Sequence, residues 1–271
     1  MPTRLRVDLA GYHHVINRGV NRCTVFNHSD DKMMFLQIIN KTALIHEVIL
    51  HDYCILDNHY HLLIETKKEN ISIFMRIVNA NYAQYYNKKY KRSGHLWQNR
   101  YKSRYITSQE YLYTLIKYIE YNPIEANISN KVGEYEFTLA SLIFNAKEHY
   151  PCCDATLLLN EFDIQTLHEF LDATITNDEL EYLKEQEKQK VVKSKEGIVL
   201  KCSKKFHEHF NDIQTKQDRN LAILDAYLDG HTQVDIAKYL NLSTSLISKI
   251  VKSGYSCTGV NGTNLSNNIT S

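Results

Sequence analysis

The sequence predicts an α+β fold with an additional all-helical module at its carboxy terminus. Two β-rich segments, residues 48–56 and 59–66, flank an Asp-Asn turn pair, which indicates an antiparallel hairpin. Apolar residues recur at helical spacing over residues 33–46 and 71–91. From about residue 218 onward the pattern is that of short helices alone. These observations separate a mixed amino-terminal part from a helical carboxy-terminal part.

The first strand and the third long helix complete the mixed part. Residues 11–18 are typical of a strand that ends in a turn at Gly19. Ser108 is a typical helix N-cap, and an acid follows it in the first turn of the predicted helix. We expect Asn122 and Pro123 to end that helix, because proline disfavours the helical conformation in the residue before it.

The predicted domain organisation has four parts. They are a mixed α/β domain (1–145), a helical extension and linker (146–195), a helical module (196–253) and a disordered tail (254–271). The extension contains predicted helices over residues 156–171 and 177–190, and the charged residues 185–195 make a plausible linker. In the helical module, a tight turn precedes residues 244–252, which resembles a helix-turn-helix with a recognition helix. The alternative is a plain three-helix packing module.

Composition sets broad limits on function. The chain has 271 residues, of which 43% are hydrophobic and 23% are charged, so it can bury a core. Its net charge is only +1, so any nucleic-acid footprint must be local. The six cysteines form no C-x-x-C pair, which indicates reduced thiols in a cytoplasmic protein. No run reaches the roughly 18 apolar residues of a membrane span, so we expect no membrane partner.

Two histidines in the predicted hairpin are candidate metal ligands. His59 and His61 are two residues apart in a strand, so they share a face while Tyr60 points the other way. Neighbouring imidazoles can bind one divalent cation if further ligands come from elsewhere. Taken alone, the spacing also fits a half-buried strand with alternating histidines. In the third helix, Tyr118 and Asn122 are four residues apart and therefore lie one turn apart on one face.

A basic, aromatic interval lies between Glu69 and Glu110, where no acidic residue occurs. Lysines and arginines interleaved with aromatic residues suit a groove that binds phosphates and stacks unpaired bases. The alternative is an ordinary solvated face. The candidate DNA-binding residues here are Lys88, Arg92, His95, Trp97, Arg100, Lys102 and Arg104, and those of the predicted recognition helix are Thr244, Ser245, Ser248 and Lys249.

Four motifs, taken together, resemble those of a known family. They are YHHVINRG at residues 12–19, DNHYHLL at 57–63, GHLWQNRYKS at 94–103 and YIEYNP at 118–123. In this order the motifs look like those of the REP-associated tyrosine transposases, which belong to the IS200-like, single-tyrosine HUH transposases (His-hydrophobic-His). The resemblance covers about residues 8–145 and adds Asn17 and Arg18, from the first motif, to the candidate DNA-binding residues. It implies a central antiparallel sheet flanked by helices.

The resemblance also implies a mechanism and its residues. His59, His61 and Asn122 fall on the metal-binding positions, with Mg²⁺ or Mn²⁺ as the expected cation, and Tyr118 falls on the nucleophile. A tyrosine in this role attacks a phosphate of single-stranded or hairpin DNA, forms a 5′-phosphotyrosine and releases a 3′ hydroxyl. The other candidate nucleophiles on the helix are Tyr111, Tyr113 and Tyr121.

The chain departs from the family pattern at a few positions. Tyr60 replaces a smaller aliphatic residue, and Asp57, which replaces a proline, could alter the hairpin or approach the metal. Glu125, Asn127 and Asn99 also differ from the family pattern. Two other functions remain open: a non-catalytic DNA-binding regulator and an RNA-binding protein on the same fold. The oligomeric state, monomer or homodimer, is open as well.

Overall fold

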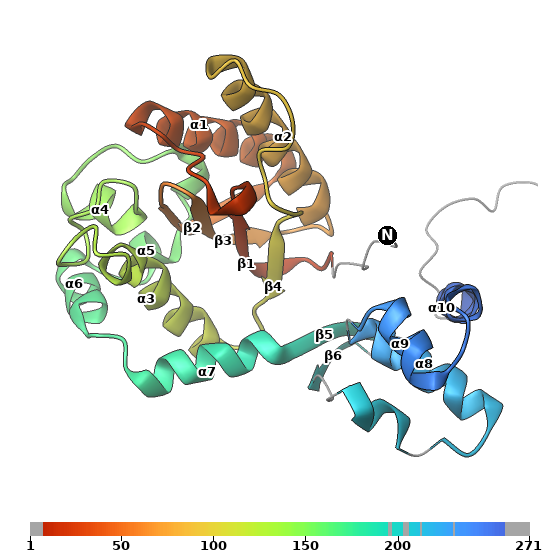
Figure 1. The fold of residues 1–271 in the computed structure, drawn as a ribbon. Coiled ribbons are helices and arrows are strands. Elements are labelled where there is room, and N and C mark those ends of the chain that lie inside the picture. The colour runs from red at the N-terminus through yellow and green to blue at the C-terminus, as the bar shows by residue number, and fades with distance from the viewer. Residues whose placement is uncertain (1–7, 195–196, 203–205, 212, 230, 258–271) are drawn as a thin grey trace, which may run out of the picture. The chain divides into compact units, whose positions relative to one another are not determined.

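The computed structural model describes residues 8–194, 197–202, 206–211, 213–229 and 231–257. The chain divides into two compact units, which lie within residues 8–187 and 188–257 of the described part (Figure 1). Most of the predicted tail lies outside the described residues. No helix in the part of the chain that the structure describes is both long and apolar enough to cross a membrane.

The first unit begins with the elements that carry the sequence motifs. In chain order they are β1 (Gly11–Arg18), the 3₁₀ turn η1 (Val20–Arg22), α1 (Ser29–His46), β2 (Val48–Ile55), β3 (His59–Thr66), α2 (Ile71–Lys89), β4 (Lys102–Tyr105) and α3 (Gln109–Glu125). They are followed by α4 (Leu139–Phe144), η2 (Pro151–Cys153), α5 (Leu157–Asn160), α6 (Ile164–Asp172) and α7 (Asn177–Lys188). The predicted α+β class is confirmed.

The four strands form one antiparallel sheet in the order β2-β3-β1-β4. Helices α1 and α2 cover one face, where the Phe35 ring of α1 lies 4.8 Å from the Tyr60 ring of β3. Helix α3 covers the opposite face, where Tyr118 lies 5.6 Å from the ring of His61. Since neighbours along a strand point to opposite faces, Tyr60 belongs to the first layer and His61 to the second. The sheet therefore lies between α1 and α2 on one side and α3 on the other (Figure 1). We call the side that contains Tyr60 the apolar layer and the side that contains the histidines the polar face.

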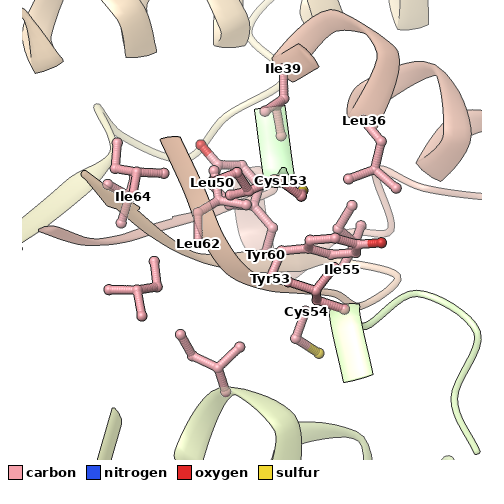
Figure 2. Packing of buried hydrophobic residues seen from close by; sticks show 14 of the residues in the cluster. Leu36, Ile39, Leu50, Tyr53, Cys54, Ile55, Tyr60, Leu62, Ile64 and Cys153 are labelled. Atoms are coloured by element: carbon pink, nitrogen blue, oxygen red, sulfur yellow. The ribbon is translucent and has the colours of Figure 1, made fainter. Parts of the chain in front are cut away.

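The apolar layer contains the centre of the core. Tyr53, Tyr60, Leu62 and Ile64 are fully or almost fully buried, and Figure 2 shows them gathered around the central strands. Burial of side chains of this size stabilises the fold by about 1.5–3 kcal/mol each. A register slip of one residue would exchange these side chains for the histidines of the other face, so the burial fixes the pairing of β3.

A β-bulge in β2 changes which side chains face α3. The pairing with β3 shifts between Leu50 and Asp52, so His51 is the extra residue. Leu50 consequently faces the apolar layer with Ile64, whereas Asp52 faces α3. His51 is held in place by its Nε2, 3.0 Å from Glu65 Oε2. The bulge thus directs an acidic side chain under the third helix.

Asp52 meets a second buried acid, Glu120, between β2 and α3. The two carboxyl groups are close enough to share a proton. One oxygen of each, Asp52 Oδ2 and Glu120 Oε2, is buried without another hydrogen-bond partner, and Glu120 Oε1 accepts a 2.8 Å bond from the Ala140 amide. Burial raises the pKa of both groups, and the Glu120 carboxyl raises that of Asp52 further. A proton shared by the pair supplies the donor between them. Because Glu120 is two residues from Tyr118, the pair joins the sheet to the helical turn that carries this tyrosine.

The structure differs from the predictions at several boundaries. Helix α3 continues through Pro123 to Glu125. Proline removes only one amide donor from the helix, and packing of the last turn offsets that loss. Strand β4 was not predicted: four residues give too short a pattern, and its partner β1 defines it. The predicted helix over 156–171 is two helices, α5 and α6. Of the predicted linker 185–195, the described residues 185–194 continue α7 and then form β5, because a charged composition indicates exposure and not a backbone conformation.

The second unit contains a strand pair and three helices. Strands β5 (Gln189–Ser194) and β6 (Gly197–Cys202) pair antiparallel, and η3 (Phe206–Phe210), α8 (Lys216–Leu228), α9 (Gln233–Leu240) and α10 (Thr244–Cys257) follow. The helices bury Ile223, Ile236 and Ile247 in a core of their own. Thr232 caps α9 by accepting the Asp235 amide, and Asn241 ends it in the left-handed conformation. These additional carboxy-terminal helices were predicted from their caps and apolar spacing.

The buried acid pair leads to a pH-dependent stability. Because the pKa of both groups is raised on folding, the folded protein binds more protons than the unfolded chain above about pH 4. The unfolding free energy should therefore fall as pH rises. Asp52→Asn replaces the proton by an amide donor, so we expect it to stabilise the protein by about 1–2 kcal/mol at pH 8.

Urea unfolding at pH 5 and pH 8 measures this effect, which should shrink at the lower pH. Glu148→Gln, at an exposed carboxylate, is the matched control and should change stability little at either pH. An Asp52→Asn protein that is less stable than the native chain at pH 8 would contradict the shared proton.

Candidate active site and nucleic-acid interface

A cavity of about 430 Å³ opens on the polar face of the sheet. Its walls come from β1, β3, α3 and the segment that leads into β4. It is lined by Ile16, Asn17, Arg18, Leu56, His59, His61, Gln98, Asn99, Arg100, Lys102, Tyr118, Asn122, Glu125 and Ala126. The structure therefore brings the predicted nucleophile, the three predicted metal ligands and four of the predicted DNA-binding residues to one place.

The ring nitrogens of His59 are distinguished by its neighbour in the hairpin turn. His59 Nδ1 lies 2.6 Å from Asn58 Oδ1. An amide oxygen only accepts, so Nδ1 carries the proton and Nε2 keeps its lone pair. Burial, followed by the nearby Arg18 charge, lowers the pKa of His59 to about 4. The imidazole is thus neutral at physiological pH, as metal ligation requires.

His61 contacts a third histidine, His14 of β1, which the sequence did not single out. Its Nδ1 lies 3.0 Å from His14 Nε2, and both residues are buried. Burial is the main cause that lowers the pKa of His61 well below its ordinary value, and the neighbouring His14, His59 and Arg18 lower it further. Burial also lowers the pKa of His14 to about 3, with a smaller effect from Arg104. Both rings are therefore uncharged.

Helix α3 places Tyr118 and Asn122 over the histidine pair. The Tyr118 ring lies 5.6 Å from His61 and 6.4 Å from His14. Asn122 Nδ2 donates a 2.6 Å hydrogen bond to the Tyr118 carbonyl, which leaves Oδ1 as the atom available to a ligand. Among the four tyrosines considered on this helix, Tyr118 alone lines the cavity. Tyr111 is buried, and the Tyr113 hydroxyl donates to Glu161.

These donors fit a divalent cation. Two neutral imidazole nitrogens and one amide oxygen form a mixed set of ligands of the kind that binds Mn²⁺ or Zn²⁺. Mg²⁺ can bind such a set as well, although it prefers oxygen ligands to nitrogen ligands. Within the described ranges, no three histidine, cysteine or acidic side chains are grouped as a metal site. The amide of Asn122 would thus be the third ligand. Asp57 does not approach this set, since its carboxylate accepts a 2.7 Å bond from Lys32.

The opposite face of the sheet supports the histidine strand from behind. The Tyr60 hydroxyl donates to Asn79 Oδ1 of α2 over 2.9 Å, and Asn17 Nδ2 donates to the same oxygen over 3.4 Å. The indole N–H of Trp97 donates to the Asn79 carbonyl. Asn17 borders the cavity, but its amide belongs to this network behind the sheet. We therefore assign Asn17 and Trp97 to the scaffold in place of the predicted DNA contact.

The predicted basic residues separate into two groups. Arg18, Arg100 and Lys102 line the cavity, and Arg104 pairs with His14 across β1 and β4, so it faces the same side. The second group lies outside the cavity, at the end of α2 and in the turn after it, and consists of Lys88, Arg92 and His95. Arg92 packs 5.8 Å from the Tyr86 ring centroid and donates to the His95 carbonyl. Of the two groups, only the first lies at the cavity or on the same face of the sheet.

Most aromatic residues of the acid-free interval serve the fold and not a stacking surface. The hydroxyls of Tyr85 and Tyr90 donate to the buried Asp31, which also pairs with Lys89. The Tyr86 hydroxyl donates to the Thr24 carbonyl. The expected base-stacking groove is therefore not formed by these side chains. The composition shows that this interval is rich in aromatic residues, but it does not show which of them are held by hydrogen bonds within the fold.

Sequence reasoning missed several residues at the cavity. Gln98 was quoted within a motif without a role, and Asn99 and Glu125 were noted only as departures from the family. The position of Gln98 is fixed by its backbone N–H, which donates a 2.9 Å hydrogen bond to the Arg18 carbonyl. His14 was missed because a pairing across strands leaves no trace in the spacing along one strand.

Part of the chain is similar to known transposases. Residues 9–122 match the family model described as "Transposase IS200 like". None of the curated proteins matches the chain. One similar solved structure is a REP-associated tyrosine transposase bound to a REP hairpin, with 17% identity and a TM-score of 0.46 over 60% of this chain and 93% of that one. Another is a candidate transposase of Deinococcus radiodurans, with 19% identity and a TM-score of 0.32 over 44% and 95%.

The family match spans the elements from β1 to the turn of α3 that carries Asn122, and it includes all the residues that line the cavity except Glu125 and Ala126. Residues 9–122 are similar to the IS200-like transposases, which supports the resemblance drawn from the sequence motifs. Both structural likenesses have low identity and TM-scores below 0.5, so they do not assign roles to individual residues. The chain adds the helices of its second unit to this domain.

Proposed function

We propose that this protein is a metal-dependent DNA strand transferase that cleaves and rejoins single-stranded or hairpin DNA through a phosphotyrosine. One observation carries the proposal: Tyr118, Asn122, His59 and His61 line a single cavity. A protein that only binds DNA or RNA needs none of these four groups together. All four come from one chain, so a monomer has a complete site. We expect the protein to act in the cytoplasm.

Tyr118 supplies the nucleophile. Its Oη attacks the phosphorus, the new bond is Oη–P, and the bond to the 3′ oxygen breaks. The phenol loses its proton, and the leaving 3′ oxygen gains one and becomes a hydroxyl. The same hydroxyl, or that of another strand, reverses the step, so strands are exchanged without an external energy source. The product is a 5′-phosphotyrosine.

The surrounding residues bind and orient the phosphate. Arg18, Arg100 and Lys102 surround the cavity and offset the charge of the scissile and neighbouring phosphates. A cation held by His59, His61 and Asn122 would polarise the phosphate oxygens and offset charge in the transition state. Uncharged ligands leave such a cation its full charge, which favours an anionic substrate. Glu125 at the rim opposes strands that approach from that side.

The second unit is proposed to bind duplex DNA as a helix-turn-helix. Helix α10 buries Ile247, Ile250 and Val251 on one side. The predicted contact residues lie on the other side: Thr244, Ser245 and Lys249 are exposed, and Ser248 is partly exposed. A short helix followed by a left-handed turn and an amphipathic helix is the arrangement that such modules use in the major groove.

Loss of the nucleophile tests the enzyme assignment. Tyr118→Phe keeps the ring that packs against His61 but removes the hydroxyl. After incubation with labelled hairpin DNA and Mg²⁺ or Mn²⁺, we expect the covalent adduct on a denaturing gel to fall at least about a hundredfold. Tyr121→Phe, one turn along the same helix, is the control and should form the adduct normally. If the Tyr118→Phe protein still forms the adduct, Tyr118 is not the nucleophile. If the native chain forms no adduct with any hairpin, the result favours the non-catalytic regulator.

Two neighbouring residues of β1 separate DNA binding from folding. Arg18→Ala should weaken hairpin binding by about 1 kcal/mol and reduce the salt dependence by about one phosphate contact, as fluorescence anisotropy in a NaCl series measures. Asn17→Ala should leave this affinity nearly unchanged and lower the unfolding free energy by about 1–2 kcal/mol, because it breaks the network at Asn79. Equal losses of affinity in the two variants would contradict the separation of the faces.

Helix α10 can be tested in the full chain. Lys249→Ala removes one exposed charge from the predicted recognition helix, so duplex affinity should fall about threefold to tenfold at low salt. The matched control is Lys147→Ala, which removes an equally exposed lysine from a loop of the first unit. If both substitutions reduce the affinity equally, the effect is one of overall charge, and the recognition helix is not the contact surface.

A further inference from the structure

His14 is a buried histidine with no role in the sequence motifs, and it contacts a predicted metal ligand. It lies on β1, on the same face as His61 of the adjacent strand. Its Nε2 is 3.0 Å from His61 Nδ1, the ring centroids are 5.2 Å apart and the ring planes are inclined by only 22°. The centroid separation exceeds the nitrogen separation by about two ring radii, so the rings lie end to end and nearly in one plane. This is the geometry of a hydrogen bond between two imidazoles.

The same geometry argues against His14 as a further metal ligand. If both nitrogens bound one cation, their lone pairs would converge on a third point and the rings would be inclined toward it. Here the two nitrogens point at each other. One of them is therefore a donor and the other an acceptor.

The direction of this bond decides what His61 presents to the cavity. A neutral imidazole has one N–H and one lone pair. If His61 Nδ1 accepts, Nε2 carries the hydrogen and cannot bind a cation. If His61 Nδ1 donates, Nε2 faces the cavity with its lone pair. His59 already has the second arrangement, because the Asn58 oxygen at its Nδ1 can only accept.

We propose that His14 is a positioning residue that accepts the Nδ1–H of His61 and thereby holds the tautomer whose Nε2 binds the cation. The inference deepens the proposed function and rests on its metal site. Metal-binding histidines usually donate their second N–H to a carboxylate, a carbonyl or water. In this protein a neutral, buried imidazole takes that place for His61, while the Asn58 amide takes it for His59. The two ligands thus have different supports, one inside the sheet and one at the hairpin turn.

The tautomer can be measured in the metal-free full-length protein. Long-range ¹H–¹⁵N spectra of histidine-labelled protein distinguish protonated Nδ1 from protonated Nε2, and His61→Gln identifies the His61 signals. We expect native His61 to be protonated at Nδ1. In His14→Phe, which keeps ring volume but removes the acceptor, the Nε2–H form should appear. Protonation of native His61 at Nε2 would overturn the proposal.

Metal affinity is the second measurement. By isothermal titration with Mn²⁺, His14→Phe should bind at least about tenfold more weakly than the native chain, as for other supporting residues of metal sites. His14→Gln retains an acceptor oxygen near the former Nε2 and should restore most of the affinity and the Nδ1–H form. His13→Gln is the matched control, since this buried histidine of the same strand bonds to the Leu9 carbonyl on the opposite face.

The outcomes separate this inference from the proposed function. Thermal unfolding shows whether each variant is folded before it is compared. A folded His14→Phe protein with native Mn²⁺ affinity and an unchanged His61 tautomer would refute the role of His14. A native protein that binds no Mn²⁺ would remove the metal site of the proposed function and with it the role of His14 toward a cation, whatever the tautomer.

Discussion

The antiparallel register between β1 and β3 is the constraint on which the site depends. It sets Ile16 opposite His61 and Arg18 opposite His59, and it places His14 where it can reach His61. A shift by one residue would turn Tyr60 toward α3 and bury both histidines against Phe35. The apolar layer prevents that shift, because the Tyr60 ring fills it and the Tyr60 hydroxyl donates to Asn79 on that side. Core packing on one face thus fixes the chemistry on the other.

Helix α3 has to be held over the sheet with equal accuracy. Apolar residues of α3 provide most of its packing, but they do not by themselves define its position along the strands. The buried pair of Asp52 and Glu120 does so, because Asp52 accepts from the Tyr53 amide of its own strand and Glu120 accepts from the Ala140 amide of α4. The bulge at His51 is what turns Asp52 toward the helix. The β-bulge in β2 and the proton shared by Asp52 and Glu120 thereby contribute to the position of Tyr118.

The sequence predicts the periodic features of this protein and misses those that depend on register. Strands β1 to β3 and helices α1 to α3 follow from apolar spacing and caps, and their faces follow from the two-residue and four-residue periods. These rules place His59 beside His61 and Tyr118 beside Asn122, whereas the meeting of the two pairs was implied by the family resemblance. Strand β4 and the His14 contact are defined by partners distant in sequence, so no local pattern reports them. The stacking groove expected from the aromatic interval was wrong for the same reason. Tyr85 and Tyr90 donate hydrogen bonds to Asp31, which is distant in sequence.

The near-neutral net charge is consistent with a local interface. Several basic residues of the acid-free interval are neutralised or packed within the fold, as Lys89 is by Asp31, while Arg100 and Lys102 remain at the cavity. In the proposed function, a polyanion is therefore attracted mainly to the cavity that contains Tyr118, and a broadly basic surface is unnecessary. Glu125 sharpens this pattern, because its charge at the rim disfavours phosphates on one side of Asn122. Under the proposed function, this charge pattern favours a strand whose phosphate lies beside Arg18 and Arg100 and away from Glu125.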